Sequence, residues 1–277
     1  MPNILTIDYQ SHNLGQDISK SLKNTGFAVI KNHPISQNLI SSVYNEWEFF
    51  FKSSHKHDYL FHPVNQDGYF PYLSENAKGH SIKDLKEFFH IYNWGRYPTQ
   101  ISDKTNKLID EFKVVAEKLL FDIQSNTPSR IRNSFSMPLD QMIQNSEQNL
   151  LRIIHYPPLS GSEDSKAVRA GAHEDINLIT LLVAGSQPGL QVLSHDNNWV
   201  DVSTSPEYIV INVGDMLQEC SKGHYPSTTH RVINPKNNNV SRYSMPFFVH
   251  ARDEVILSEK HTAKSYLEER LKEIGLK

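Results

Sequence analysis

Residues 170–180 read AGAHEDINLIT, which places His173 and Asp175 two positions apart, directly before an apolar run. On a β-strand, side chains at positions i and i+2 point to the same face, so this imidazole and this carboxylate could bind one metal ion together. About one such His-x-Asp triplet is expected by chance in a chain of this composition. The pair therefore indicates a metal site only if further ligands stand at suitable places elsewhere in the sequence.

The sequence around this stretch is typical of a β-rich fold. From about residue 149 onward, short β-branched or alternating runs are separated by turn-rich pieces such as GSQPG and NPKNNN. The runs are LLRIIHY, NLITLLVA, LQVLS, WVDVS, YIVINVGD, STTHRVI and RYSMPFFVHA. Strands at this spacing, without helices between them, favour an antiparallel sandwich or barrel over a parallel sheet.

The first half of the chain has mostly helical patterns. Apolar residues recur at helical spacing in residues 14–25, 38–51 and 104–124, and the short strand-like run FAVI follows Gly26. We interpret these stripes as core packing, so YNEWEFFFK is not a stacking surface for nucleic acid. The tail TAKSYLEERLKEI returns to helix. We expect one compact unit with four parts: an N-terminal region of helices and short strands at 1–100, helical support at 101–148, a catalytic core at 149–252 and a C-terminal helix at 253–277.

The composition limits the classes of protein to which this chain can belong. The chain has 277 residues, of which 38% are hydrophobic and 21% charged, as in ordinary soluble globular proteins. A net charge of −3 gives no electrostatic reason to expect a nucleic-acid or membrane partner. The start MPNILTIDYQ has no secretory pattern, and the single cysteine, Cys220, suits a reducing compartment as a buried small hydrophobe. We therefore expect a cytoplasmic protein, and a monomer.

A third metal ligand should come from a strand that is distant in sequence but adjacent in space. His195 and His224 fall in a turn and a loop, whereas His230 begins the extended segment STTHRVINP. Two histidines and one carboxylate on one side of a metal form the facial triad of non-haem Fe(II) oxygenases. Such a triad leaves three adjacent coordination positions, two for a chelating cosubstrate and one for O2.

A fixed cation is the next requirement of that chemistry. A 2-oxo acid that chelates iron leaves its distal carboxylate buried, and the planar fork of arginine pairs a carboxylate best. Arg242 stands twelve residues after His230 and is followed at i+2 by Ser244. On a strand these two side chains share a face, so both could hold one carboxylate.

These motifs together resemble the iron/2-oxoglutarate-dependent dioxygenases of the isopenicillin N synthase-like family. The resemblance extends over nearly the whole chain, because the matching segments occur in that family's order. They are ILTIDYQ, KNTGFAVIKNHPI, EFFFK, LKEFFHI, LRIIHYPP, AGAHEDINLITLL, GLQVL, WVDV, INVGDMLQECSKG, YPSTTHRV and RYSMPFF. The resemblance implies a mainly β fold with flanking helices around a double-stranded β-helix core (a jelly roll, cupin-like).

The resemblance also implies roles for particular residues. It makes one set of side chains the Fe(II) ligands: His173, Asp175 and His230. It makes Arg242 and Ser244 the clamp on the distal carboxylate of 2-oxoglutarate. Tyr156 matches a tyrosine that contacts this cosubstrate, and Phe248 matches a position that often lines the substrate pocket. No catalytic side chain beyond the metal ligands is implied.

The implied activity is that of an oxidoreductase. It would use Fe(II), 2-oxoglutarate and O2, and would couple oxidative decarboxylation of 2-oxoglutarate to C–H oxidation of a small molecule, by hydroxylation or desaturation. Some positions depart from the family pattern: Ile154 stands where plant relatives often have asparagine, Glu174 separates the two ligands, and Lys222 replaces a common asparagine. The loop NPKNNNV also lengthens the interval before Arg242 slightly. The change at Ile154 removes one polar contact to the cosubstrate.

Other interpretations stay open on the sequence alone. An iron oxidase of the same fold would use the same triad without 2-oxoglutarate, and a jelly-roll module could bind a metal or ligand without catalysis. A zinc hydrolase could use two histidines and a carboxylate, but it would have no use for Arg242. We interpret HKHD at 55–58 as a solvated turn and His155 as a packing residue.

Overall fold

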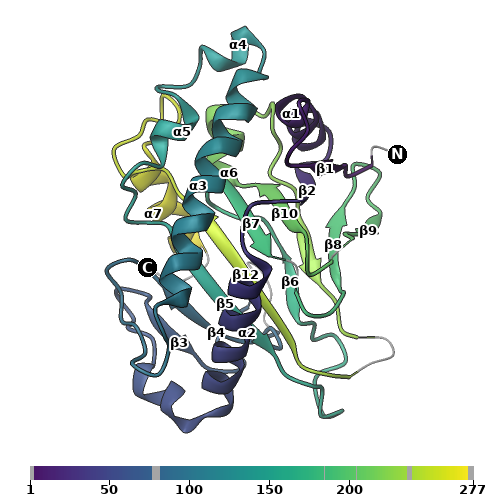
Figure 1. Ribbon diagram of the computed structural model, residues 1–277, viewed down its shortest axis with the longest axis vertical. Helices are drawn as coiled ribbons and strands as arrows, with labels where there is room; N and C mark the ends of the chain where they lie inside the picture. Colours follow the sequence, from purple (N-terminus) through teal and green to yellow (C-terminus); the bar gives the residue numbers. More distant parts are fainter. Residues whose placement is uncertain (1–2, 77–81, 184, 204, 236–238, 274–277) are drawn as a thin grey trace.

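The computed structural model describes residues 3–76, 82–183, 185–203, 205–235 and 239–273. Its strands form two facing sheets, with helices against the larger one (Figure 1). Among the described residues, the larger sheet has eight strands in the order β1-β2-β10-β7-β12-β5-β4-β3, and the smaller has four in the order β6-β11-β8-β9. All the strand pairs described are antiparallel except β1 with β2.

The strands of the larger sheet are, in spatial order, β1 (Thr6–Asp8), β2 (Phe27–Lys31), β10 (Ile209–Val213), β7 (Ile179–Val183), β12 (Arg242–Val249), β5 (Leu150–Tyr156), β4 (Glu87–Ile91) and β3 (Gly68–Phe70). Those of the smaller sheet are β6 (Ala170–His173), β11 (His230–Val232), β8 (Leu190–Leu193) and β9 (Trp199–Asp201). Each apolar run predicted after residue 149 contains one of these strands. A mainly β architecture with flanking helices was expected, and it is observed.

Two details of the strands were not specified by the sequence pattern. The first half of the chain, whose pattern is mostly helical with short strands, contributes β3 and β4 to the larger sheet. β4 is buried along its whole length, so its run EFFHI lacks the alternation that marks a half-exposed strand. The strand before the His-x-Asp pair is also short: β6 ends at His173, so Asp175 lies in the following loop. There the carbonyl of Asp175 accepts a hydrogen bond from the N–H of Asp215 and not from a strand partner.

Helices cover the outer face of the larger sheet. The long ones are α1 (Leu14–Thr25), α2 (Gln37–Lys52), α3 (Lys104–Ser125) and α7 (Ala263–Glu273); the short ones are η1 (Ser54–Tyr59), α4 (Ser129–Arg132), α5 (Leu139–Met142) and α6 (Asp215–Cys220). In Figure 1, α3 runs across the sheet formed by β12, β5 and β4, with α2 below it. Trp47 of α2 donates a hydrogen bond from Nε1 to Oγ1 of Thr105, 3.0 Å away, which fixes α2 against α3.

A glycine fixes the junction between the first helix and the sheet. α1 ends at Gly26, whose φ of 70° is left-handed, and β2 begins at the next residue. A Cβ at this position would lie 2.6 Å from the carbonyl oxygen of Pro226, so both the conformation and the close contact require glycine. The turn directs β2 along β10 in the larger sheet.

The larger sheet separates two apolar cores, and this separation positions the site. Along β12, Tyr243, Met245, Phe247 and Val249 belong to the core beneath the helices. The alternate residues Arg242, Ser244 and Phe248 therefore face the space between the two sheets. That inner space is otherwise lined by apolar side chains of both sheets, including Ile154, Leu182, Val192, Val210 and Val232.

Three minor expectations can be compared with the structure. Cys220 is buried, as expected. HKHD lies in η1, where His55 and Asp58 form an exposed pair, which fits a solvated turn. No helix in the described part of the chain has both the length and the apolar character needed to cross a membrane.

Candidate metal centre

Two paired strands bring the two distant histidines together. His173 ends β6 and His230 begins β11, and these residues are direct partners in the antiparallel ladder, with ring centroids 4.4 Å apart. Asp175 follows in the loop, and its Oδ1 lies 3.8 Å from Nε2 of each histidine. The ligand atoms of the three side chains all lie within 4.8 Å of one another. The structure thus gathers the three residues that the sequence had singled out.

Main-chain carbonyls orient both imidazole rings. Nδ1 of His173 lies 2.8 Å from the carbonyl oxygen of Gly171, and Nδ1 of His230 lies 3.1 Å from that of Thr228. A carbonyl oxygen can only accept, so each Nδ1 carries the proton and each Nε2 presents a lone pair toward Asp175. This is the arrangement that metal-binding histidines need.

Two hydrogen bonds hold the carboxylate of Asp175. Oδ2 accepts from Oγ1 of Thr180 on β7 at 2.6 Å and from Nδ2 of Asn212 on β10 at 2.8 Å, which leaves Oδ1 facing the histidines. Burial alone would raise the pKa of Asp175, but His230, His173 and these two hydrogen bonds together lower it. The side chain is therefore an ionised carboxylate near neutral pH.

The centre is open on one side. The side chain of His173 is 37% exposed, whereas those of Asp175 and His230 are 6% and 10% exposed. Burial and the neighbouring His230 lower the pKa of His173, so its imidazole is neutral near pH 7. Two imidazole nitrogens and one carboxylate oxygen on one side of a common point suit Fe(II) with open coordination positions. The donor set thus fits a non-haem iron site.

The predicted clamp lies on the inner face of the larger sheet. Arg242 begins β12, is 1% exposed and is the ladder partner of Tyr156 on β5. Its guanidinium carbon lies 5.0 Å from the centre of the Tyr156 ring. Ser244 follows on the same face and is buried. The structure therefore brings Arg242, Ser244 and Tyr156 onto one surface between the sheets.

The guanidinium of Arg242 has the surroundings of an anion-binding group. Nε donates to the carbonyl oxygen of Gln187 at 3.0 Å. Nη1 is buried, and none of the described residues accepts a hydrogen bond from it. A buried cation with an unsatisfied donor loses its hydration without compensation, and a carboxylate bound against it offsets that loss of free energy. The distal carboxylate of 2-oxoglutarate fits this position.

Phe248 and a residue that the sequence analysis missed lie farther along the same face. Phe248 is the ladder partner of Thr180, the residue that donates to Asp175. The guanidinium carbon of Arg152 lies 5.4 Å from the ring centre of Phe248 and 4.5 Å from that of Phe88. Arg152 shares a strand face with Tyr156 at period two, and this signal could have placed it beside the predicted site.

His90 holds Arg152 in place. Nε of Arg152 donates to Nε2 of His90 at 2.8 Å, while Nδ1 of His90 donates to the carbonyl oxygen of Gln66 at 2.7 Å. Burial and the nearby Arg152 keep the pKa of His90 well below its usual value, so the ring is neutral and can accept. His155 instead stacks on Tyr243, a residue of the core beneath the helices, with ring centres 4.6 Å apart, which agrees with a packing role.

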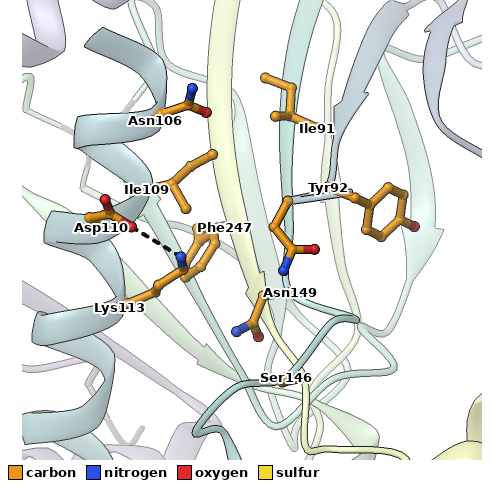
Figure 2. A pocket seen from close by; sticks show the side chains of 10 residues that line it. Ile91, Tyr92, Asn106, Ile109, Asp110, Lys113, Ser146, Asn149 and Phe247 are labelled. Atoms are coloured by element: carbon orange, nitrogen blue, oxygen red, sulfur yellow. Dashed lines mark hydrogen bonds and ion pairs between the residues drawn. The ribbon is translucent and has the colours of Figure 1, made fainter. Parts of the chain in front are cut away.

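A cavity of about 260 Å³ lies on the opposite side of the larger sheet (Figure 2). Its lining includes Ile109, Asp110 and Lys113 of α3, together with Phe247 of β12. Phe247 belongs to the core beneath the helices, whereas the neighbouring Phe248 faces the space between the sheets. The sheet therefore separates this cavity from the metal centre, and the cavity is no part of that site.

Comparison with known proteins supports the same class. Residues 147–251 match the model of the 2OG-Fe(II) oxygenase superfamily, and residues 4–111 match that of the N-terminal region of non-haem dioxygenases in morphine synthesis. The chain is 29% identical to gibberellin 2-beta-dioxygenase 4 of Arabidopsis thaliana over 257 residues, covering 88% of this chain and 78% of that protein. It is 28% identical over 257 residues to the 2-oxoglutarate-dependent dioxygenase citB of Monascus ruber, with 84% and 77% covered.

Solved structures of similar fold belong to the same class of protein. A candidate oxygenase from Shewanella oneidensis is 45% identical, with 99% of each chain covered and a TM-score of 0.89. A full-length Neurospora crassa protein in complex with alpha-KG and thymine shares the fold at 24% identity, with 97% and 96% covered and a TM-score of 0.80. The chain belongs to the 2OG-Fe(II) oxygenase superfamily, within its isopenicillin N synthase-like branch. Three predictions are confirmed: the jelly-roll core, the oxidoreductase activity, and the use of Fe(II) as cofactor with 2-oxoglutarate and O2 as cosubstrates.

Proposed function

We propose that His173, Asp175 and His230 bind the Fe(II) of this oxygenase. The observation that carries the proposal is the convergence of two oriented Nε2 atoms and one Asp175 oxygen on a common point. Thr180 and Asn212 fix the carboxylate from behind, so that Oδ1 stays directed at the metal position. No further side chain is needed as a proton donor or acceptor at the iron.

Arg242 and Ser244 bind the distal carboxylate of 2-oxoglutarate in this proposal, and Tyr156 lies beside it. Two observations support these roles: Nη1 of Arg242 has no acceptor among the described residues, and Ser244 lies on the same strand face. The relatives that depend on 2-oxoglutarate favour this cosubstrate as the ligand of the buried cation over the carboxylate of an oxidase's own substrate. Bound Fe(II) would supply O2 activation, which drives decarboxylation of 2-oxoglutarate and C–H oxidation of the substrate.

The chain's own residues orient the reactants and exclude water. The apolar inner faces of both sheets surround the space between the metal centre and Arg242, so that little bulk water reaches it. Phe248 and Arg152 lie on the wall nearest Thr180 and form part of the substrate pocket in this proposal. The substrate is a small molecule, comparable in kind to the thymine bound in the Neurospora crassa structure.

The proposal also covers the cellular location and the oligomeric state of the protein. We place the enzyme in the cytoplasm as a monomer, with the core at 149–252 and the three flanking regions working as one unit. The single buried cysteine suits a reducing compartment. Light scattering of the purified chain measures the oligomeric state directly.

A turnover screen tests the function. Protein loaded with Fe(II) is given 2-oxoglutarate, O2 and a panel of small metabolites, and succinate is measured together with any oxygenated product. We expect one class of metabolite to stimulate succinate formation in the wild type and in His195→Ala, which removes an exposed histidine outside the triad. His173→Ala should form none. Succinate formation by His173→Ala at the wild-type rate contradicts the proposed metal site.

A further inference from the structure

Arg169 is a second buried arginine near the cosubstrate position. It immediately precedes β6, four residues before His173, and is 1% exposed. Nη2 donates to the carbonyl oxygen of Val240 at 2.8 Å. Nε is buried, and within the described ranges it has no hydrogen-bond partner. The side chain thus keeps a full charge in the interior with one donor unused.

The guanidinium groups of Arg169 and Arg242 converge on one aromatic ring. Their central carbons lie 5.9 Å and 5.0 Å from the ring centre of Tyr156. Burial, followed by repulsion from Arg242, lowers the pKa of Arg169, which is the effect of two like charges held close together away from water. Each cation thus increases the cost of burying the other.

Another buried cation in this chain, Lys86, is neutralised by neighbouring carboxylates. Nζ of Lys86 lies 2.7 Å from a carboxylate oxygen of Glu75 and 2.8 Å from one of Asp84. The hydrogen bonds found for Arg169 and Arg242 in the described part of the chain go only to main-chain carbonyls. A neutral carbonyl cannot balance two positive charges, so a bound anion is the group that stabilises this pair.

We propose that Arg169 and Arg242 together bind the distal carboxylate of 2-oxoglutarate, Arg242 through Nη1 and Arg169 through Nε, the two buried donors without an acceptor among the described residues. The proposal rests on the assignment of Arg242 to that carboxylate. A two-arginine site favours a 2-oxo acid with a distal carboxylate over one that ends in a methyl group, because the methyl group leaves both cations unpaired.

Binding measurements with a redox-inert metal test this without turnover. The Zn(II)-loaded protein is titrated calorimetrically with 2-oxoglutarate and with 2-oxovalerate, which has a methyl group in place of the distal carboxylate. We expect Arg169→Gln to weaken 2-oxoglutarate binding about 10- to 100-fold, as for loss of a charge-assisted contact, and to change 2-oxovalerate binding less than about twofold. Arg169→Lys keeps the charge without the planar fork, and its affinity for 2-oxoglutarate should lie between those of the wild type and Arg169→Gln.

Controls separate this proposal from a purely structural role. Arg130→Gln, at an exposed position on α4, should bind both ligands as the wild type does. Zinc content and circular dichroism are compared for every variant, and Arg169→Lys carries the test if Arg169→Gln does not fold. Equal weakening of both ligands, or no weakening of either, overturns the role of Arg169.

The same titrations keep the two proposals distinguishable. If the wild type binds 2-oxoglutarate no better than 2-oxovalerate, the proposed clamp at Arg242 fails, and the role of Arg169 fails with it. If the wild type discriminates, and Arg242→Gln loses discrimination while Arg169→Gln retains it, only the Arg169 proposal fails.

Discussion

Oγ1 of Thr180 donates a 2.6 Å hydrogen bond to Oδ2 of Asp175, and this contact directs the other carboxylate oxygen toward His173 and His230. Thr180 belongs to β7 of the larger sheet, whereas both histidines belong to the smaller sheet. The metal centre therefore depends on how the two sheets are held together, because one supplies the imidazoles and the other fixes the carboxylate.

Thr180→Val removes this donor and keeps the shape of the side chain. We expect Fe(II) affinity to fall about 10- to 100-fold, since partners that orient metal ligands have effects of this size. Competition with a coloured chelator measures the affinity. Thr180→Ser keeps the hydroxyl and should remain close to the wild type. Equal affinities of Thr180→Val and Thr180→Ser would show that the hydrogen bond does not support the metal.

Arg242→Lys keeps the charge and removes the planar fork. We expect the dissociation constant for 2-oxoglutarate in the Zn(II)-loaded protein to rise at least about tenfold, because one point charge replaces two directed donors. Zn(II) affinity should be unchanged, since Arg242 is no metal ligand. A fall in zinc content that matches the loss of 2-oxoglutarate binding would instead indicate general disruption of the core.

Phe247 and Phe248 are neighbours in sequence but face opposite sides of the sheet. Phe247 is fully buried and stacks on Phe112 with ring centres 5.4 Å apart, so Phe247→Ala should lower the free energy of unfolding by about 3–5 kcal/mol. Phe248 is only partly buried, so Phe248→Ala should cost clearly less stability and should mainly change substrate-stimulated turnover. Urea denaturation compares the two variants. Equal losses of stability would contradict the assignment of the two faces.

His90 gives the metal-free protein a pH-dependent stability. Its pKa is well below the ordinary 6.5 in the folded state, so below about pH 6.5 only the unfolded chain takes up this proton. Above about pH 6.5, His90 therefore does not lower the free energy of unfolding. As the pH falls below about 6.5, the free energy of unfolding decreases by about 1.4 kcal/mol per pH unit, until the pH reaches the pKa of His90 in the folded state. Urea denaturation from pH 7 to 5 should show a shallower decline for His90→Gln than for the wild type. Parallel curves would count against a neutral His90.

The sequence predicted the strands of the core more fully than the local geometry around the candidate metal ligands. The run LLRIIHY became β5 with its limits unchanged, because its apolar and β-branched residues all lie in the sheet. AGAH became a four-residue strand, three small residues followed by His173, so Asp175 reaches the metal position from a loop. The structure brings His173 and Asp175 together with His230, but the expectation that the pair shares one strand face was wrong.

Arg152 and Arg169 show what a single sequence hides. A charged residue within or beside a strand is usually placed on the exposed face. The period-two spacing from Tyr156 is a local signal against that choice for Arg152, whereas Arg169 has no such signal. Both side chains are directed inward because of partners far away in sequence: His90 and Phe248 for Arg152, and Val240 for Arg169. Only the folded chain shows that Arg169 is buried and that no carboxylate of the described residues pairs with it.

The most direct test of the iron site is a spectrum without oxygen. Anaerobic addition of Fe(II) and then 2-oxoglutarate should give a weak visible charge-transfer band in the wild type and in His195→Ala, and none in His173→Ala. A band that persists unchanged in His173→Ala would contradict the central claim that His173, Asp175 and His230 hold the metal to which 2-oxoglutarate binds.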